Sequence, residues 1–212
     1  MRLKTTIGLF EYWDRIRGQD CAPLRSQVEP TDLRQILSSV FLLETSDAGR
    51  VVFRLAGTRI CDFFDRDLGG AALTELWAHS HDDIETIAAG VMEHATPALL
   101  SVTGSSSAGH RACFEMILLP LRSDNGRCDK ILGALAPDAS PSWLEVVPLQ
   151  VLTLDHSHLM RERPGADWEL SDAEPMEDAS CARPPSIGDT IRRVVSDLFN
   201  EGGASGVPFR NN

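Results

Sequence analysis

The sequence predicts an α+β fold in which helices lie on one side of an antiparallel β-sheet. Residues 39–57 form a hairpin pattern, with two β-rich runs joined by the turn-forming segment 45–49. Helical patterns follow between residues 58 and 97, and three β-rich segments come after them, PALLSVTGS, RACFEMILLPLR and DKILGALAP. Strands and helices are thus segregated along the chain, which favours antiparallel pairing over alternating βαβ units.

Two helices are expected before the hairpin. The first occupies TIGLFEYWDRIR, where apolar side chains recur at helical intervals, and Gly18 ends it. The second is a short helix after Pro30 that Thr31 or Asp32 can cap, and its apolar stripe consists of Leu33, Ile36 and Leu37.

The segment VVFRLAGTRICDFFDRDLGG joins the second hairpin strand to a helix. Phe53 and Leu55 occupy alternate positions of the strand, so both are expected to face the core. Gly57 lets the chain turn closely against the sheet. Thr58 can cap a helix of about two turns, which the Gly-Gly pair at 69–70 ends.

The same junction predicts no phosphate site. A dinucleotide-binding loop needs G-x-G-x-x-G before a full helix, whereas Gly57 stands alone. Arg59 is instead expected to join a local charge network with Asp62, Asp65 and Asp67.

The longest helix is expected to begin at Ser80 and to end before Pro97. Asp82 and Asp83 favour the positive end of its macrodipole, and its inward face carries Ile84, Ile87, Ala88, Val91 and Met92. Among the later strands, the Asn-Gly pair at 125–126 gives the strongest reversal signal. A last β-rich run, EVVPLQVLTL, contains a proline, which indicates an edge position or a bulge.

Length and charge bound the possible functions. The 212 residues predict a helical leader at 1–29, a domain at 30–158, an acidic linker at 159–185, and an amphipathic helix with a tail at 186–212. The formal charge of −11 disfavours nucleic acid as a direct ligand, because a polyanion requires clustered basic side chains. No apolar run is long enough to cross a bilayer and no signal peptide is recognisable, so we expect a cytoplasmic protein with no membrane insertion.

Three motifs carry a resemblance to a known family. YWD at 12–14, RLAGTR at 54–59 and the Leu76-Trp77 pair resemble a subfamily of small bacterial PAS proteins, common in alphaproteobacteria and long catalogued as a domain of unknown function. The similarity covers roughly residues 5–157. It implies a PAS-like five-stranded antiparallel sheet that cups a small cavity against its helices. It also implies a regulator or sensor, often without an attached enzymatic domain.

The expected lining of that cavity comes from the strands and the long helix. The candidate residues are Phe53, Leu55, Phe64, Trp77, Ile87, Val91, Phe114, Met116 and Leu118. The alternative is that they only form the core, since a pocket is a shortage of filling that composition does not reveal. In haem-binding PAS sensors a histidine of the long helix binds the iron, and His81 lies near the corresponding start. A surface or capping histidine is the favoured explanation of His81, because one histidine without a second diagnostic feature is thin support for haem, so the cofactor stays unknown.

Other reactive sites are not predicted. The His pairs at 79 and 81 and at 156 and 158 lack a third and fourth metal ligand. The five cysteines are scattered without C-x-x-C spacing, which indicates reduced thiols. No nucleophile elbow or Walker loop is present, so we expect no enzyme.

The last part of the chain combines an acidic linker with an amphipathic helix that is expected to bind another surface. PGADWELSDAEPMEDASCA has six acidic and no basic residues, which predicts disorder. The amphipathic helix after it exposes a stripe made of Ile187, Ile191, Val194, Val195, Leu198 and Phe199. Such a stripe needs a surface, which is its own sheet, a second copy in a homodimer, or a partner such as a signalling kinase or regulator.

The leading functional hypothesis is a non-enzymatic PAS regulator that acts through protein contact and is gated by a small ligand. A haem- or metabolite-binding sensor and a ligand-free assembly scaffold are the alternatives.

Overall fold

The structure is a computed structural model that describes residues 1–162 and 168–172. The chain divides into two units, Met1–Ser180 and Cys181–Asn212, and all described residues belong to the first. The predicted C-terminal helix, with its apolar stripe, lies outside the described residues, as does most of the acidic linker.

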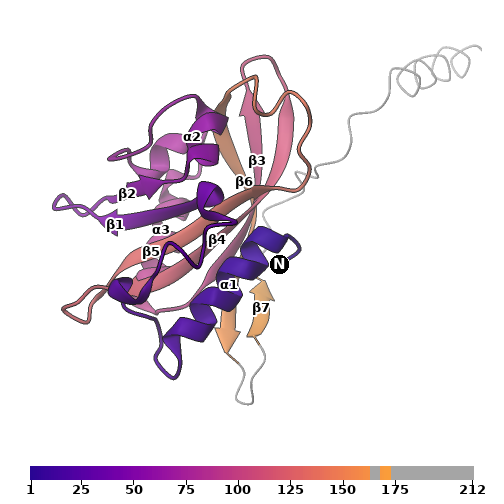
Figure 1. The fold of residues 1–212 in the computed structure, drawn as a ribbon. Coiled ribbons are helices and arrows are strands. Elements are labelled where there is room, and N and C mark those ends of the chain that lie inside the picture. Colours follow the sequence, from indigo (N-terminus) through magenta and orange to yellow (C-terminus); the bar gives the residue numbers. More distant parts are fainter. Residues whose placement is uncertain (163–167, 173–212) are drawn as a thin grey trace, which may run out of the picture. The chain divides into compact units, whose positions relative to one another are not determined.

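One antiparallel sheet organises the described residues (Figure 1). Its strands run in the order β2-β1-β5-β4-β3-β6-β7, and each neighbouring pair is antiparallel. The strands are β1 (Val40–Thr45), β2 (Val51–Ala56), β3 (Ala98–Ser106), β4 (Arg111–Arg122), β5 (Cys128–Pro137), β6 (Leu149–Glu162) and β7 (Trp168–Asp172). The predicted α+β class is confirmed. The five strands of the expected sheet are β1 to β5, the predicted last β-rich run EVVPLQVLTL corresponds to the first part of β6, and β6 and β7 extend the sheet beyond β3.

The helices lie on both faces of the sheet (Figure 1). They are α1 (Lys4–Arg17), α2 (Thr58–Phe64) and α3 (His81–Glu93), with 3₁₀ turns η1 (Arg25–Gln27), η2 (Leu37–Ser39) and η3 (Leu73–Leu76). We call the face under α2 and α3 the inner face and the face under α1 the outer face. Each face has its own apolar core, so α1 is an integral layer of the fold rather than a separate leader.

A buried carboxylate and an indole fix α1 on the outer face. Glu115 of β4 is 4% exposed and accepts hydrogen bonds from the backbone N–H of Arg2 (3.0 Å) and of Leu3 (3.2 Å), and from the Thr6 hydroxyl. The first N–H groups of a helix have no acceptor within the helix, and the Glu115 carboxylate supplies an acceptor at the start of α1. At the middle of α1, the Trp13 indole N–H donates to the Pro120 carbonyl at 2.7 Å. Polar contacts at two points therefore set the position of α1.

The short helix predicted after Pro30 does not form, and the cap and end predicted for the next helix are wrong. After Pro30 the chain forms successive turns and then η2, because backbone hydrogen bonds such as Ile36 N–H to Leu33 O (2.9 Å) close at three-residue spacing. α2 is preceded by Gly57 and not capped by the Thr58 side chain, and it ends at Phe64, where Asp65 adopts a left-handed conformation (φ 49°).

A bulge in β2 overturns the predicted alternation of that strand. Leu42 pairs with Leu55, and Leu43 pairs with Phe53, so Arg54 is an extra residue on β2. Phe53 faces the inner core, but Leu55 falls on the outer face beside Leu42 and is 52% exposed.

The close turn predicted at Gly57 is confirmed. A Cβ atom there would lie 2.3 Å from the Ser38 carbonyl oxygen and 2.5 Å from that of Leu37. The Gly57 N–H donates to the Val40 carbonyl at 2.8 Å. Only glycine permits this approach, which holds the start of α2 against η2.

Three further expectations have outcomes in the described residues. Trp168–Asp172, placed in the disordered linker by composition, forms β7, because β6 offers a free edge for backbone pairing. Cys21, Cys61 and Cys128 carry free thiols, whereas Cys113 is disulfide-bonded, so the expectation of reduced thiols is wrong for Cys113. No described helix has the length and apolar character that a membrane span requires.

Candidate functional site

Most of the predicted cavity residues meet on the inner face. The residues buried together there are Phe53, Phe64, Trp77, Val91, Phe114, Met116 and Leu118, and Ile87 packs against them while partly exposed. They come from β2, α2, α3, β4 and the residue that follows η3, so distant parts of the chain converge on one core.

Aromatic rings fill this core at its centre. A Cβ atom at Gly133 would lie 2.2 Å from the Phe41 ring, and one at Gly104 would lie 2.7 Å from the Phe114 ring. The Phe41 and Phe53 ring centroids are 5.6 Å apart in an edge-to-face arrangement, a favourable geometry. Among the described residues, the Trp77 indole nitrogen Nε1 of this core is buried without a hydrogen-bond partner.

His81 and Leu55 do not belong to this core. His81 is exposed on the first turn of α3, and its Nε2 lies 2.9 Å from the Trp77 carbonyl oxygen, so the ring contacts backbone at the helix start. The bulge in β2 carries Leu55 to the outer face. The expectation that Leu55 lines the inner cavity is therefore wrong, and the exposed position of His81 agrees with a surface or capping histidine.

The predicted charged contacts of Arg59 are also revised. Its guanidinium pairs with Glu145 at 3.2 Å and donates to the Ser140 hydroxyl at 3.2 Å, while its Cζ lies 5.6 Å from the Phe63 ring centroid. Arg59 therefore has the expected structural role, but the groups that it contacts lie in the loop between β5 and β6 and are not the neighbouring aspartates. No group of three potential metal ligands occurs within the described part of the chain.

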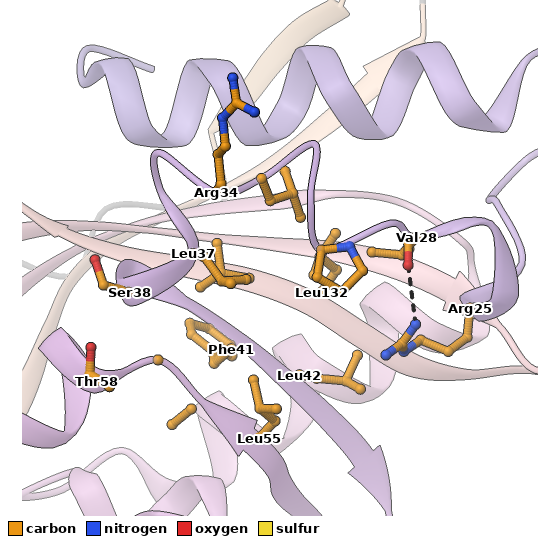
Figure 2. Close-up of a pocket in the computed structure, with 15 residues that line it drawn as sticks. Arg25, Val28, Arg34, Leu37, Ser38, Phe41, Leu42, Leu55, Thr58 and Leu132 are labelled. Atoms are coloured by element: carbon orange, nitrogen blue, oxygen red, sulfur yellow. Dashed lines mark hydrogen bonds between the residues drawn. The ribbon is translucent and has the colours of Figure 1, made fainter.

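A groove on the outer face is the candidate binding site (Figure 2). We call it the outer groove. It encloses about 500 Å³. Its floor is Val40, Leu42 and Leu132 from β1 and β5, and its two sides carry Val28, Leu33 and Leu37 before β1 and Leu55 at the end of β2. Volumes of this size and apolar linings are typical of ligand sites.

Exposed apolar side chains gather at this groove. Three large apolar residues are exposed among those described: Leu37 (37%), Leu55 (52%) and Val146 (77%). Leu37 and Leu55 both border the outer groove, on opposite sides of it (Figure 2). Single exposed apolar residues are ordinary, but two on the rim of an apolar groove mark a contact surface.

Two arginines differ in how they meet the groove. The Arg25 guanidinium lies on the groove side of its segment and donates to the Val28 carbonyl at 3.5 Å, whereas the Arg34 guanidinium points away from the other lining residues (Figure 2). Within the described ranges neither guanidinium pairs with a carboxylate. Arg25 is therefore a half-buried cation beside an apolar floor.

Two residues with shifted pKa values, Cys128 and Asp155, lie outside the outer groove and the inner core. Burial raises the pKa of the Cys128 thiol to about 11, so this cysteine stays protonated at neutral pH. Burial also raises the pKa of the Asp155 carboxyl, against the effect of the hydrogen bond that the Thr103 hydroxyl donates at 2.8 Å. Neither residue lines the outer groove.

Strand order and helix placement define the class of this domain. The sheet portion β2-β1-β5-β4-β3, with α2, η3 and α3 inserted between β2 and β3 over the inner face, is an α+β domain built on one antiparallel sheet. A family model described as a PAS domain matches residues 1–136, and the chain belongs to that family. PAS domains are typically sensory and not catalytic, so the family indicates a sensory signalling domain.

Solved structures with partial similarity to this chain have low sequence identity to it. A light-oxygen-voltage domain studied with a flavin analogue is 12% identical, with a TM-score of 0.42 over 54% of this chain and 87% of that one. An RNA-binding light-oxygen-voltage receptor is 15% identical (TM-score 0.40; 51% and 33%), and VqmA bound to DPO is 16% identical (TM-score 0.40; 55% and 60%). The chain thus spans a third of that receptor and three fifths of VqmA. No curated protein matches this chain.

Proposed function

We propose that this chain is a non-enzymatic PAS signalling protein of the cytoplasm that acts by contact with a protein partner, and that the outer groove is its contact surface. The observation that supports this is the exposure of Leu37 and Leu55 on the rim of the groove. Contiguous exposed apolar surface costs solubility and is typical of protein interaction sites.

The chemistry of the groove fits a protein contact better than a reaction. Its side chains are mostly aliphatic, and such groups supply burial energy and shape without activating a substrate. A partner that inserts an apolar side chain between Leu37 and Leu55 would bury both. The partner is expected to be a signalling kinase or a regulator, because the net charge of −11 opposes direct contact with nucleic acid.

The proposed mechanism is a shift between populations of states with different outer faces. α1 covers part of this face, and the turns that form one side of the outer groove pack against it, since the Glu29 N–H donates to the Tyr12 hydroxyl at 2.8 Å. A ligand or partner that prefers one arrangement of these turns changes the surface on display by as much as its affinities differ.

The test compares two exposed apolar sites. Wild type, Leu55→Asp and Val146→Asp are used to capture partners from cytoplasm of the source organism, and a captured signalling protein is then purified and titrated by calorimetry. We expect Leu55→Asp to weaken binding at least about tenfold, because it buries a carboxylate in an apolar contact. Val146→Asp should bind as wild type. Equal binding by all three proteins would contradict the proposal.

The buried Trp77 indole favours a second candidate, a sensor with a small ligand in the inner core. An N–H without an acceptor loses about 1–3 kcal/mol, which a ligand oxygen would restore. A thermal-shift screen of small carbonyl and carboxylate compounds on wild type and Trp77→Phe tests this. A hit whose shift is equal in Trp77→Phe is not bound through the indole. Absorbance near the Soret band tests haem separately.

A further inference from the structure

We infer that the outer groove also binds a free medium-chain fatty carboxylate, with the alkyl chain along Val40, Leu42 and Leu132 and the carboxylate on Arg25. Such a ligand would occupy the surface that the proposed function gives to the protein partner, and would therefore compete with it. Only this competition rests on the proposed function, since binding itself is a property of the purified chain.

Packing and backbone hydrogen bonds on both sides of the outer groove hold it open in this structure. On one side, Val28 and Leu33 are buried in the outer core, and the Tyr12 hydroxyl accepts the Glu29 N–H. On the other side, the contact of Gly57 with the Ser38 backbone and the hydrogen bond to Val40 fix the start of α2. In this arrangement of the turns, packing and hydrogen bonds hold the walls apart, and a preformed apolar space favours an apolar ligand.

The bulge in β2 supplies the remaining wall. If Arg54 were paired regularly instead of bulged, strand alternation would turn Leu55 to the inner face beside Phe53. The bulge instead places an aliphatic side chain opposite Leu37, across the floor (Figure 2). An alkyl chain between the two leucines would cover surface that water now contacts.

Arg25 selects the charge of the ligand. A guanidinium has five N–H donors, and the described contact of Arg25 is one long bond to the Val28 carbonyl. A carboxylate accepts two parallel N–H bonds from such a group and neutralises it, whereas a cationic amphiphile would place a second positive charge there. One cation at the border of an apolar floor therefore matches an aliphatic chain that ends in one anion.

The ligand is expected to be a free monomer and not a membrane lipid. The chain carries a formal charge of −11, which opposes approach to an anionic bilayer surface. A monomer in solution meets only the local field of Arg25, because distant charges are screened beyond about 8 Å at physiological ionic strength.

The experiment titrates dodecanoate, below its micelle concentration, into the purified full chain by isothermal calorimetry. We expect one site per chain. Arg25→Gln should weaken binding at least about tenfold, because a charge-assisted pair is lost. Arg34→Gln is the matched control and should change the affinity less than about twofold, since its guanidinium points away from the groove. Leu55→Asp should abolish binding, and circular dichroism verifies that each variant is folded.

Several results would overturn the inference. They are the absence of dodecanoate binding to wild type, equal affinity for dodecyltrimethylammonium, and equal loss in Arg25→Gln and Arg34→Gln. Binding that persists in both Arg25→Gln and Leu55→Asp would place the ligand elsewhere, for example in the inner core. Stronger association with phosphatidylglycerol vesicles than with monomeric dodecanoate would show a membrane surface as the target.

The design separates this inference from the proposed function. If dodecanoate binds as expected but Leu55→Asp captures the same partners as wild type, the result supports the ligand site and contradicts the proposed partner surface. If Leu55→Asp loses a partner while dodecanoate does not bind, the opposite holds.

Discussion

The inner and outer faces of the sheet are covered to different degrees. On the inner face, α2, η3 and α3 enclose a continuous core in which phenylalanine rings interlock, such as Phe63 and Phe114 at 5.4 Å between centroids. On the outer face, α1 packs on β4 and β5, and the end of the sheet near β1 and β2 keeps exposed leucines around a groove. The comparison indicates that the inner face supplies most of the stability and that the outer face is available for binding.

The largest expected effect separates two neighbours on β2 that face opposite ways. Phe53→Ala should destabilise the fold by about 3–5 kcal/mol, because it leaves a cavity in the inner core. Leu55→Ala should cost less than about 1 kcal/mol, because half of that side chain is already in water. Urea unfolding of both variants measures the difference. A similar loss of unfolding free energy in the two variants would contradict the proposed difference between the inner and outer faces.

A smaller loss of stability is expected when Glu115, whose carboxylate holds the start of α1 on the outer face, is replaced. Glu115→Ala should destabilise by about 1–3 kcal/mol, because partly buried N–H groups at the start of α1 lose their acceptor. Hydrogen exchange of α1 amides should accelerate more than that of α3 amides. Glu11→Gln, an exposed change on α1 itself, is the control and should leave both unchanged. Uniform acceleration in α1 and α3 would mean that the two layers unfold together.

Asp155 gives a pH test on β6. Burial is the main cause of its raised pKa, so the folded state holds the proton more tightly than the unfolded state does. Above the unfolded value of 3.8, stability therefore falls as the pH rises through the folded pKa, and it is regained as the pH falls. Asp155→Asn should remove this slope and slightly stabilise the protein at neutral pH. Urea midpoints between pH 4 and pH 8 measure it, and an unchanged slope in the variant would contradict the assignment.

The elements of the inner layer were predictable because their signals are local. The hairpin turn, the apolar period of α3 and the strands after Pro97 are each encoded in one stretch of sequence. The inner core followed from those elements, since alternate residues such as Phe114 and Met116 must share a face.

The helix α1 was predicted, but its position on the outer face of the sheet was not, because the signals for that contact lie in distant parts of the sequence. Ile117, Leu119 and Leu132 are apolar at positions that a one-sided sheet would leave polar, and near-continuous apolar strands indicate cover on both faces. Glu115 in the same run is the partner of an N-terminal helix 112 residues away. The bulge at Arg54 is hidden because a charged residue at that position also fits regular alternation.

The smallest stability effect is the most informative for the outer groove. Leu55→Asp should change the free energy of unfolding by less than about 1 kcal/mol, because half of the side chain is already in water and no partner on the inner face is disturbed. Denaturant titration at pH 7 measures this. A near-zero change, together with a lost partner or ligand, would assign Leu55 to binding alone. A loss comparable to that of Phe53→Ala would instead mean that Leu55 supports the fold, and the outer groove would then be part of the core and not a surface for contact.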